Sequence, residues 1–219
     1  MKRTLATTLC VLAAGCSGDD AMITPTVDAA PMIDAAPVPT GYTAKGGFAV
    51  ALGEARARSA DAVSFTVTGQ HIVASGGVID PANAQSYWGY AFLDLGRGKR
   101  FDVLWLQDAF RVSEQTANTE TSRTITTAWI DSDAAIAKLV EAGFELPGAG
   151  EPFTTVGMAL AMYVGQSEDL QAIEEPIWRV TKVTAPPGET PMGEEWLVTH
   201  WAAMDGYLIC SPAECTILP

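Results

Sequence analysis

Hydrophobic and polar positions in the first half of the chain follow first helical and then strand spacing. In residues 46–62, Phe48, Leu52 and Ala55 recur on one helical face, and residues 62–69 then alternate apolar and polar positions as a half-buried strand does. Two aromatic runs, SYWGYAFLDL and KRFDVLWLQ, are joined by GRGK, whose glycines supply positive φ. This half therefore predicts a helix, a strand and a β-hairpin, with DAFRVSE as a continuing or additional strand.

The same order of patterns returns after residue 128. WIDSDAAIAKLVEAG predicts a helix that is capped by Asp131 or Ser132, carries Asp133 near its positive N-terminus and ends at Gly143. FTTVGMALAMYVG follows as a strand, although its period alone leaves a buried helix open. PIWRVTKVT and EEWLVTHWAAM flank the turn-rich APPGETPMG, and MDGYLIC closes the pattern.

This order predicts an α+β fold for residues 45–219, with helices packed on an antiparallel sheet. Two repeated helix-plus-β-hairpin units would occupy residues 46–118 and 129–215. The length is sufficient for a sizeable core, in one domain or in two small ones.

The N-terminus has the three parts of a secretory signal peptide, which we place at residues 1–15. Lys2 and Arg3 form a short basic head, a mostly apolar run follows, and small residues precede Cys16. The apolar run is shorter than the roughly 20 residues that span a bilayer, and no later run reaches that length. Residues 16–44 are rich in Ala, Pro and Asp and contain the imperfect repeat DAAPMI-DAAPVP, which predicts an extended, disordered linker.

The residues before the cysteine resemble the lipobox of bacterial lipoproteins. Ala13, Ala14 and Gly15 stand directly before Cys16, and in that family the cysteine becomes the first mature residue and carries acyl chains. The resemblance implies lipidation of Cys16 and a membrane anchor through the acylated N-terminus. Because Ser17 rather than Asp follows, it favours the outer membrane over the inner one. An ordinary signal peptide with an incidental cysteine is the alternative.

Composition narrows the classes of partner. The chain carries 13 Lys+Arg and 26 Asp+Glu, a formal net charge of −13 at pH 7, which repels nucleic acid, so we expect no nucleic-acid partner. Of the four cysteines, Cys10 leaves with the signal peptide and Cys16 takes lipid. Cys210 and Cys215 remain for a disulfide in an oxidising compartment, since a metal site would need more ligands and a redox pair is more usually Cys-x-x-Cys.

The usual catalytic patterns are missing from the sequence. A histidine-dependent site would have to use His71 or His200, there is no Gly-x-Ser-x-Gly elbow, and no cysteine stays free as a nucleophile. Asp131 and Asp133 lack the remaining ligands of a calcium loop, so helix capping is the better interpretation. We therefore predict no catalytic residue, no metal and no cofactor.

Six tryptophans are many for a chain of this length. We expect most of them to fill a core between helix and sheet, because a tryptophan buries a large apolar area. Trp196 and Trp201 have opposite parity in one predicted strand, so without a bulge at most one of them faces the core. This pair is therefore the candidate binding surface.

Two features of the folded region resemble the PepSY-type unit of bacterial exported proteins. One is the start of the helix in WIDSDAAIAKLVEAG, and the other is a strand that closes on a turn, LQDAFRV in the first half and AMDGYLI in the second. The resemblance implies a helix laid on a small antiparallel sheet and no catalytic residue. It also implies a role in binding or restraining other exported proteins, such as proteases.

These patterns together predict a lipid-anchored envelope protein that is not an enzyme and binds an exported protein or peptide. The alternative is an envelope-structural lipoprotein that contacts peptidoglycan or surface glycan through exposed aromatic side chains. A third interpretation is a hydrolase with an unrecognised site, which would need a cleft that gathers His71 or His200 with distant carboxylates.

Overall fold

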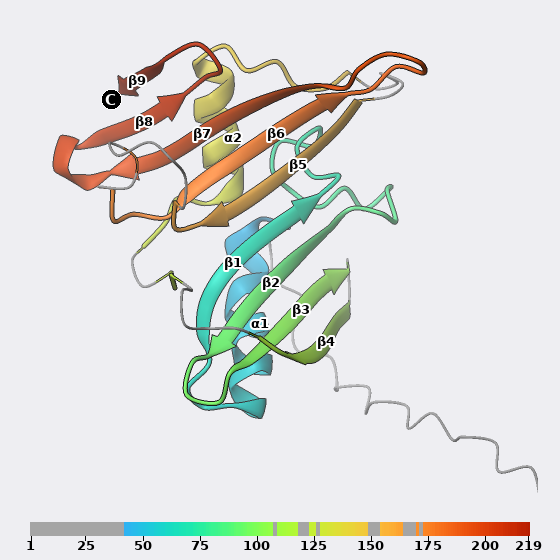
Figure 1. The fold of residues 1–219 in the computed structure, drawn as a ribbon, viewed down its shortest axis with the longest axis vertical. Helices are drawn as coiled ribbons and strands as arrows, with labels where there is room; N and C mark the ends of the chain where they lie inside the picture. The colour runs from blue at the N-terminus through green and yellow to red at the C-terminus, as the bar shows by residue number, and fades with distance from the viewer. Residues whose placement is uncertain are drawn as a thin grey trace, which may run out of the picture. The chain divides into compact units, whose positions relative to one another are not determined.

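The computed structural model describes residues 42–106, 109–117, 123–125, 128–148, 154–163, 170 and 173–219. Nine strands of these residues form one antiparallel sheet in the order β4-β3-β2-β1-β5-β6-β7-β8-β9 (Figure 1). The helices are α1 (Ala44–Arg58) and α2 (Ser132–Glu141), with a short 3-10 turn, η1 (Ala202–Met204). The strands are β1 (Val63–Gln70), β2 (Tyr87–Asp94), β3 (Lys99–Leu106), β4 (Ala109–Thr116), β5 (Thr154–Ala161), β6 (Ile177–Thr184), β7 (Met192–Trp201), β8 (Gly206–Cys210) and β9 (Cys215–Leu218).

The described chain is predominantly β, so the predicted α+β fold built from helix-plus-hairpin units is wrong. The expected hairpins do not form separate small sheets, because β1 pairs with β5, with Val67 opposite Leu160 and Gln70 opposite Gly157. Each helix precedes a run of at least four antiparallel strands, and all of these strands share one hydrogen-bonded sheet. The pattern also missed β9, which pairs with β8 at the end of the chain.

Several local predictions are confirmed. The β2–β3 hairpin spans the two aromatic runs, α2 begins after an Asp131 cap, and the apolar segment at Thr154–Ala161 is a strand and not a helix. Local patterning was therefore sufficient for these elements, although it gave the wrong fold class.

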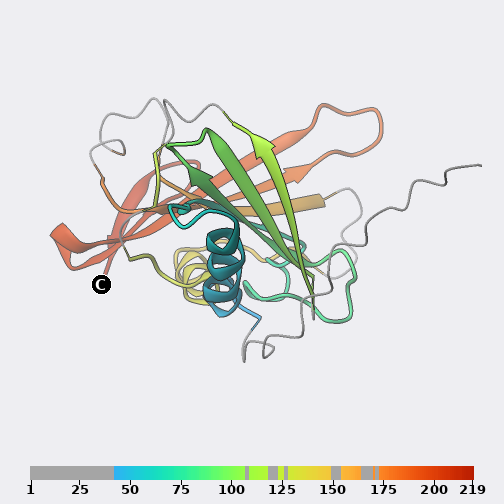
Figure 2. The same cartoon turned by 90° about the horizontal axis from the view of Figure 1, so that it is seen from below.

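Both helices lie on the same face of the sheet (Figure 2). The strand residues beneath them alternate along each strand, and in β2 the residues of the other face are buried as well. Six such residues in β2 and β3 are at most 1% exposed: Trp88, Tyr90, Phe92, Phe101, Val103 and Trp105. The main core therefore lies between the helices and one sheet face.

Small residues form the buried face of α1. Its buried positions are Ala44, Gly47, Ala51 and Ala55. Phe48 and Leu52, which the sequence placed on the buried stripe, are only partly buried. A Cβ at Gly47 would overlap the Trp105 ring, so the glycine lets the helix approach the large aromatic side chains of the sheet closely.

The N-termini of the two helices meet at Asp131 and Ser132. One carboxylate oxygen of Asp131 accepts the backbone N–H groups of Ser132 (2.8 Å) and Lys45 (3.0 Å). The Ser132 hydroxyl accepts the Ala44 N–H (2.9 Å) and donates to the Gly77 carbonyl (2.6 Å). Residues that cap α2 therefore also satisfy free N–H groups at the start of α1.

Two buried indoles fix the chain just before each helix. Trp88 of β2 donates its Nε1–H to the Tyr42 carbonyl (2.9 Å), and Trp178 of β6 donates to the Ile130 carbonyl (2.8 Å). The two indole rings lie 5.9 Å apart between centroids. Both helix starts are thereby anchored to the middle of the sheet.

A buried carboxylate ties the β2–β3 turn to the end of α1. Ser59, directly after the helix, donates its hydroxyl to Asp94 (2.5 Å), and the Arg97 backbone N–H donates to the other Asp94 oxygen (2.9 Å). The hydrogen bond from Ser59, together with those from the turn and the nearby Arg97 charge, lowers the pKa of Asp94 below its ordinary value.

Replacement of Gly77 by Ala tests the helix junction. Gly77 has φ +87°, and a Cβ there would lie 2.5 Å from the Ser132 carbonyl oxygen. We expect Gly77→Ala to lower the free energy of unfolding by about 3 kcal/mol, because left-handed strain adds to displaced junction hydrogen bonds. Gly76, with φ +73° and open space around it, is the matched control, and Gly76→Ala should cost about 1 kcal/mol. Urea unfolding of both variants measures the difference, and equal losses would contradict a tight junction.

The Asp94 carboxylate predicts an acid-dependent stability. Because its pKa is lowered in the folded protein, the ionised group stabilises the fold above the unfolded pKa of about 3.9, and this stabilisation is lost as the pH falls through the folded pKa. Asp94→Asn should therefore unfold at lower urea than the unchanged protein at pH 7, and the gap should narrow below about pH 4. The exposed Asp61 gives the control Asp61→Asn. A gap of constant size across pH would contradict the assignment.

Candidate functional site

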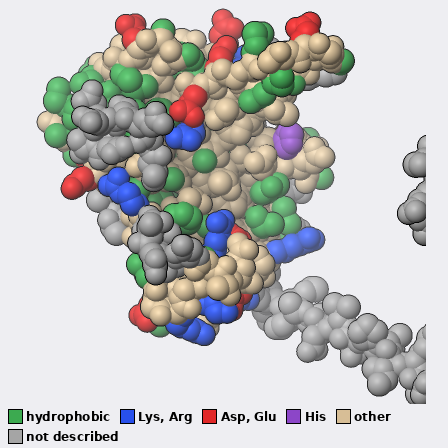
Figure 3. Space-filling model, in the orientation of Figure 1, with side chains coloured by type: hydrophobic (Ala, Val, Ile, Leu, Met, Phe, Trp, Pro, Cys, Tyr) green, Lys and Arg blue, Asp and Glu red, His purple; other side chains and the backbone are tan. Residues whose placement is uncertain are grey.

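The sheet face opposite the two helices, called the open face below, has short side chains at its centre. These residues lie on β1, β2 and β5: Thr66, Thr68, Gly89, Gly157, Ala159 and Ala161. Figure 3 looks onto this face, and the middle of the view is formed mainly by atoms that are neither charged nor hydrophobic side chains. Short side chains let another molecule come close to the sheet backbone there.

One register row of the open face runs across β4, β3, β2, β1, β5, β6 and β7. Its members are Arg111, Leu104, Gly89, Thr68, Ala159, Arg179 and Leu197. The adjacent row contains Val67, Tyr90 and Trp178, which are core residues beneath the helices, so the first row points to the opposite side. An arginine therefore stands on each side of a floor of small residues.

A pocket of about 200 Å³ opens beside this floor. Its lining is mostly apolar: Ala159, Ala161, Met162, Tyr163, Ile177 and Leu197. Ile177 and Leu197 belong to a second buried cluster, in which Leu170 and Ile173 pack on the open-face side chains of β6, β7 and β8. The pocket therefore lies between this apolar cluster and the floor of small residues.

Arg179 is the charged group in the pocket lining. Its Nε lies 3.2 Å from a carboxylate oxygen of Glu195 on β7, and the two side chains are 45% and 49% exposed. An ion pair this exposed contributes little to stability. The ion pair therefore keeps the guanidinium near the pocket mouth, but it is weak enough for the guanidinium to change partner.

Other arginines on this face have different surroundings. Arg100 binds Asp102 on the same strand (2.7 Å), and Arg123 donates to the Tyr163 carbonyl (3.1 Å). Arg111 is exposed and makes no ion pair within the described residues. Within the described residues, the charges of Arg100 and Arg179 are thus paired with carboxylates, whereas the charge of Arg111 is not.

The structure places Trp196 and Trp201 on opposite faces and does not bring them together. Trp196 lies on the helix side, where its ring meets Phe144 edge-on at 5.6 Å between centroids, and its Nε1 is buried without a partner. Trp201 packs against the second cluster on the open-face side. Neither Arg179 nor the floor of small residues was predicted from the sequence. The even spacing of Gly157, Ala159 and Ala161 was the available signal for that floor.

The two histidines lie in different settings. His71 is exposed, with φ +52°, and lines a second pocket of about 300 Å³ with Ser75, Asp80 and Asn83. The Ser75 hydroxyl lies within hydrogen-bonding distance of two backbone carbonyls of its own loop. Among the described residues, no hydrogen bond joins His71 to Ser75 or Asp80. His200 instead meets the Tyr207 ring at 5.3 Å.

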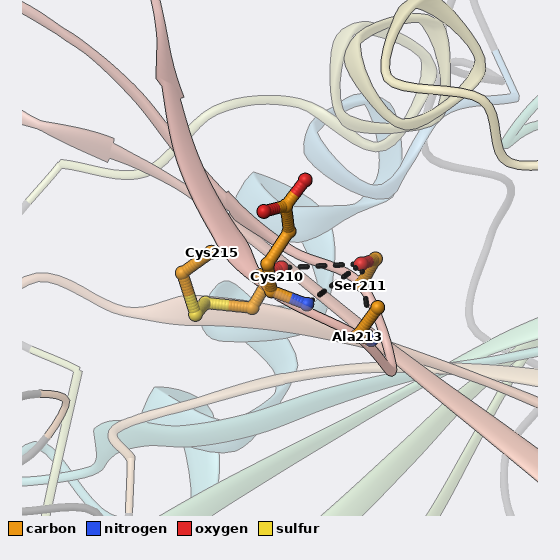
Figure 4. The surroundings of a disulfide bond; sticks show 5 residues. Cys210, Ser211, Ala213 and Cys215 are labelled. Atoms are coloured by element: carbon orange, nitrogen blue, oxygen red, sulfur yellow. Dashed lines mark hydrogen bonds between the residues drawn. A yellow bond between two sulfur atoms is a disulfide. The ribbon is translucent and has the colours of Figure 1, made fainter.

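Cys210 and Cys215 form a disulfide, as predicted (Figure 4). They are register partners on β8 and β9, and the turn between them is closed by a Ser211 N–H bond to the Glu214 carbonyl (2.8 Å). The predicted signal peptide (1–15), Cys16 and nearly all of the linker (16–44) lie outside the described residues.

No helix of the described segments is long and apolar enough to cross a bilayer. Within the same segments, no group of three or more His, Cys, Asp or Glu side chains could hold a metal ion. No protein-family model, curated protein or solved structure matches the chain. The lipoprotein and PepSY-type resemblances therefore remain predictions.

Proposed function

We propose that this chain is a lipid-anchored envelope protein, not an enzyme, whose domain binds an exported protein or peptide through the open face. The observation that carries the proposal is the floor of small, mostly half-buried residues between Arg111 and Arg179, with an apolar pocket at its edge. An apolar anchor point with arginine beside it is typical of the centre of protein interfaces.

The composition of the open face supports binding more than simple solvation. The solvated side of an antiparallel sheet normally carries long polar or charged residues. The floor carries Thr68, Gly157 and Ala159 instead, which expose little charge and cost little conformational entropy when covered. A partner can therefore cover them without burying unpaired ions.

The glycan-binding alternative has less support. Stacking on sugars needs exposed aromatic faces, and Trp88, Trp105 and Trp178 are fully buried. Tyr163 and Trp201 on the open-face side are partly buried, so they offer a smaller aromatic surface than the sequence suggested.

A photo-crosslinking pair tests the binding face. We expect p-benzoylphenylalanine in place of Thr68, at the centre of the floor, to capture an envelope protein reproducibly in cells. The same residue in place of Ala137, which is exposed on α2, should not capture that protein. Identical capture at both positions would reject the open face as the binding surface. Adducts with wall material alone would move the function to the glycan-binding alternative.

A pair of cysteine variants tests the anchor. Metabolic labelling with an alkyne fatty acid should mark the unchanged protein and the Cys10→Ser variant, because Cys10 lies in the segment that is removed. Cys16→Ser should lose the label and leave the membrane fraction, since stable anchoring requires the acyl chains. Labelling that survives Cys16→Ser would reject the lipidation site.

A further inference from the structure

The pocket beside the floor combines two chemical features that a single ligand group can match. Its walls are apolar side chains from β5, β6, β7 and the residues after β5. Arg179 adds a guanidinium to the same lining, and a guanidinium binds carboxylate oxygens through two parallel hydrogen bonds. The matching ligand is therefore an apolar group with a carboxylate close to it.

The volume of the pocket limits which ligands with an apolar group and a carboxylate can fit. The pocket volume of about 200 Å³ is slightly larger than the roughly 150 Å³ that accommodates one benzene ring in an apolar protein cavity. It has room for one large apolar side chain but not for a long acyl chain. In the last residue of a peptide, the side chain and the terminal carboxylate share one Cα, so one residue can present both groups to the same pocket.

Glu195 already presents a carboxylate to Arg179. One of its carboxylate oxygens lies 3.2 Å from the Nε of the guanidinium, and the Glu195 side chain is 49% exposed. The remaining guanidinium N–H groups can donate to a second carboxylate, and the weak exposed pair can open at little cost. Glu195 is therefore a built-in competitor for the same donors.

We infer that this pocket binds the C-terminal residue of the partner, with an apolar side chain inside and the terminal carboxylate on Arg179. The inference rests on the proposed function. The residues before the C-terminus would lie over Ala159 and Thr68, toward Leu104, in the register row of the open face.

Peptide binding to the full chain in neutral detergent tests the inference. The probes are an N-acetylated peptide of alanines ending in phenylalanine and its C-terminal amide, both fluorescently labelled and measured by anisotropy. The free acid should bind at least about ten-fold more tightly than the amide, because the amide loses the charge-assisted hydrogen bonds. Arg179→Gln should weaken the acid by a similar factor, and Glu195→Gln should tighten it.

Matched variants separate the pocket from general effects. Arg56→Gln, which changes an exposed arginine of α1 on the other face of the sheet (Figure 2), should leave binding unchanged. Ala159→Leu, which fills the pocket, should abolish binding while circular dichroism stays unchanged. Equal affinity for acid and amide, or displacement of the peptide by octanoate as readily as by unlabelled peptide, would overturn the inference. If Thr68 crosslinking persists in that case, the proposed function stands; if it is also absent, both are rejected.

Discussion

The shared capping of two helix N-termini is the constraint on which the rest of this structure depends. Each helix start carries partial positive charge, and the Asp131 carboxylate lies between them, bound to the N–H groups of Lys45 and Ser132. The Tyr90 hydroxyl, whose pKa is raised by burial and then by the Asp131 charge, donates to the Ala44 carbonyl (2.9 Å). The phenol thus remains a hydrogen-bond donor that holds the first turn of α1 on the sheet.

This junction places α1 and α2 on one side of the sheet, and neither of them covers the other side of the central strands (Figure 2). An antiparallel sheet tolerates helices on one side only. In β1, β2 and β5, most large side chains alternate with small ones, and the large side chains point toward the helices. The second cluster covers only the open-face residues of β6, β7 and β8. The pocket beside Arg179 exists because this cover ends at Ile177 and Leu197.

Sequence patterning was informative wherever the determining contacts were local. The Asp131 cap, the β2–β3 hairpin and the Cys210–Cys215 pair each depend on residues close together in the chain. The fold class depended on β1 pairing with β5, about ninety residues apart in the chain, a contact that no local period encodes. The candidate site could not be predicted from the sequence for the same reason, since Thr68, Ala159 and Arg179 become neighbours only through strand register. Trp196 and Trp201 lie on opposite faces of the sheet because they have opposite parity within β7.

The negative net charge of the chain and the positive charge of Arg179 act over different distances. A chain with formal charge −13 repels acidic molecules at long range, but salt screens this repulsion beyond about 8 Å at physiological ionic strength. Contact with Arg179 occurs within hydrogen-bonding distance, where screening is weak. The overall charge therefore slows the approach of acidic partners in general, whereas a guanidinium beside an apolar pocket selects a carboxylate that brings the right side chain.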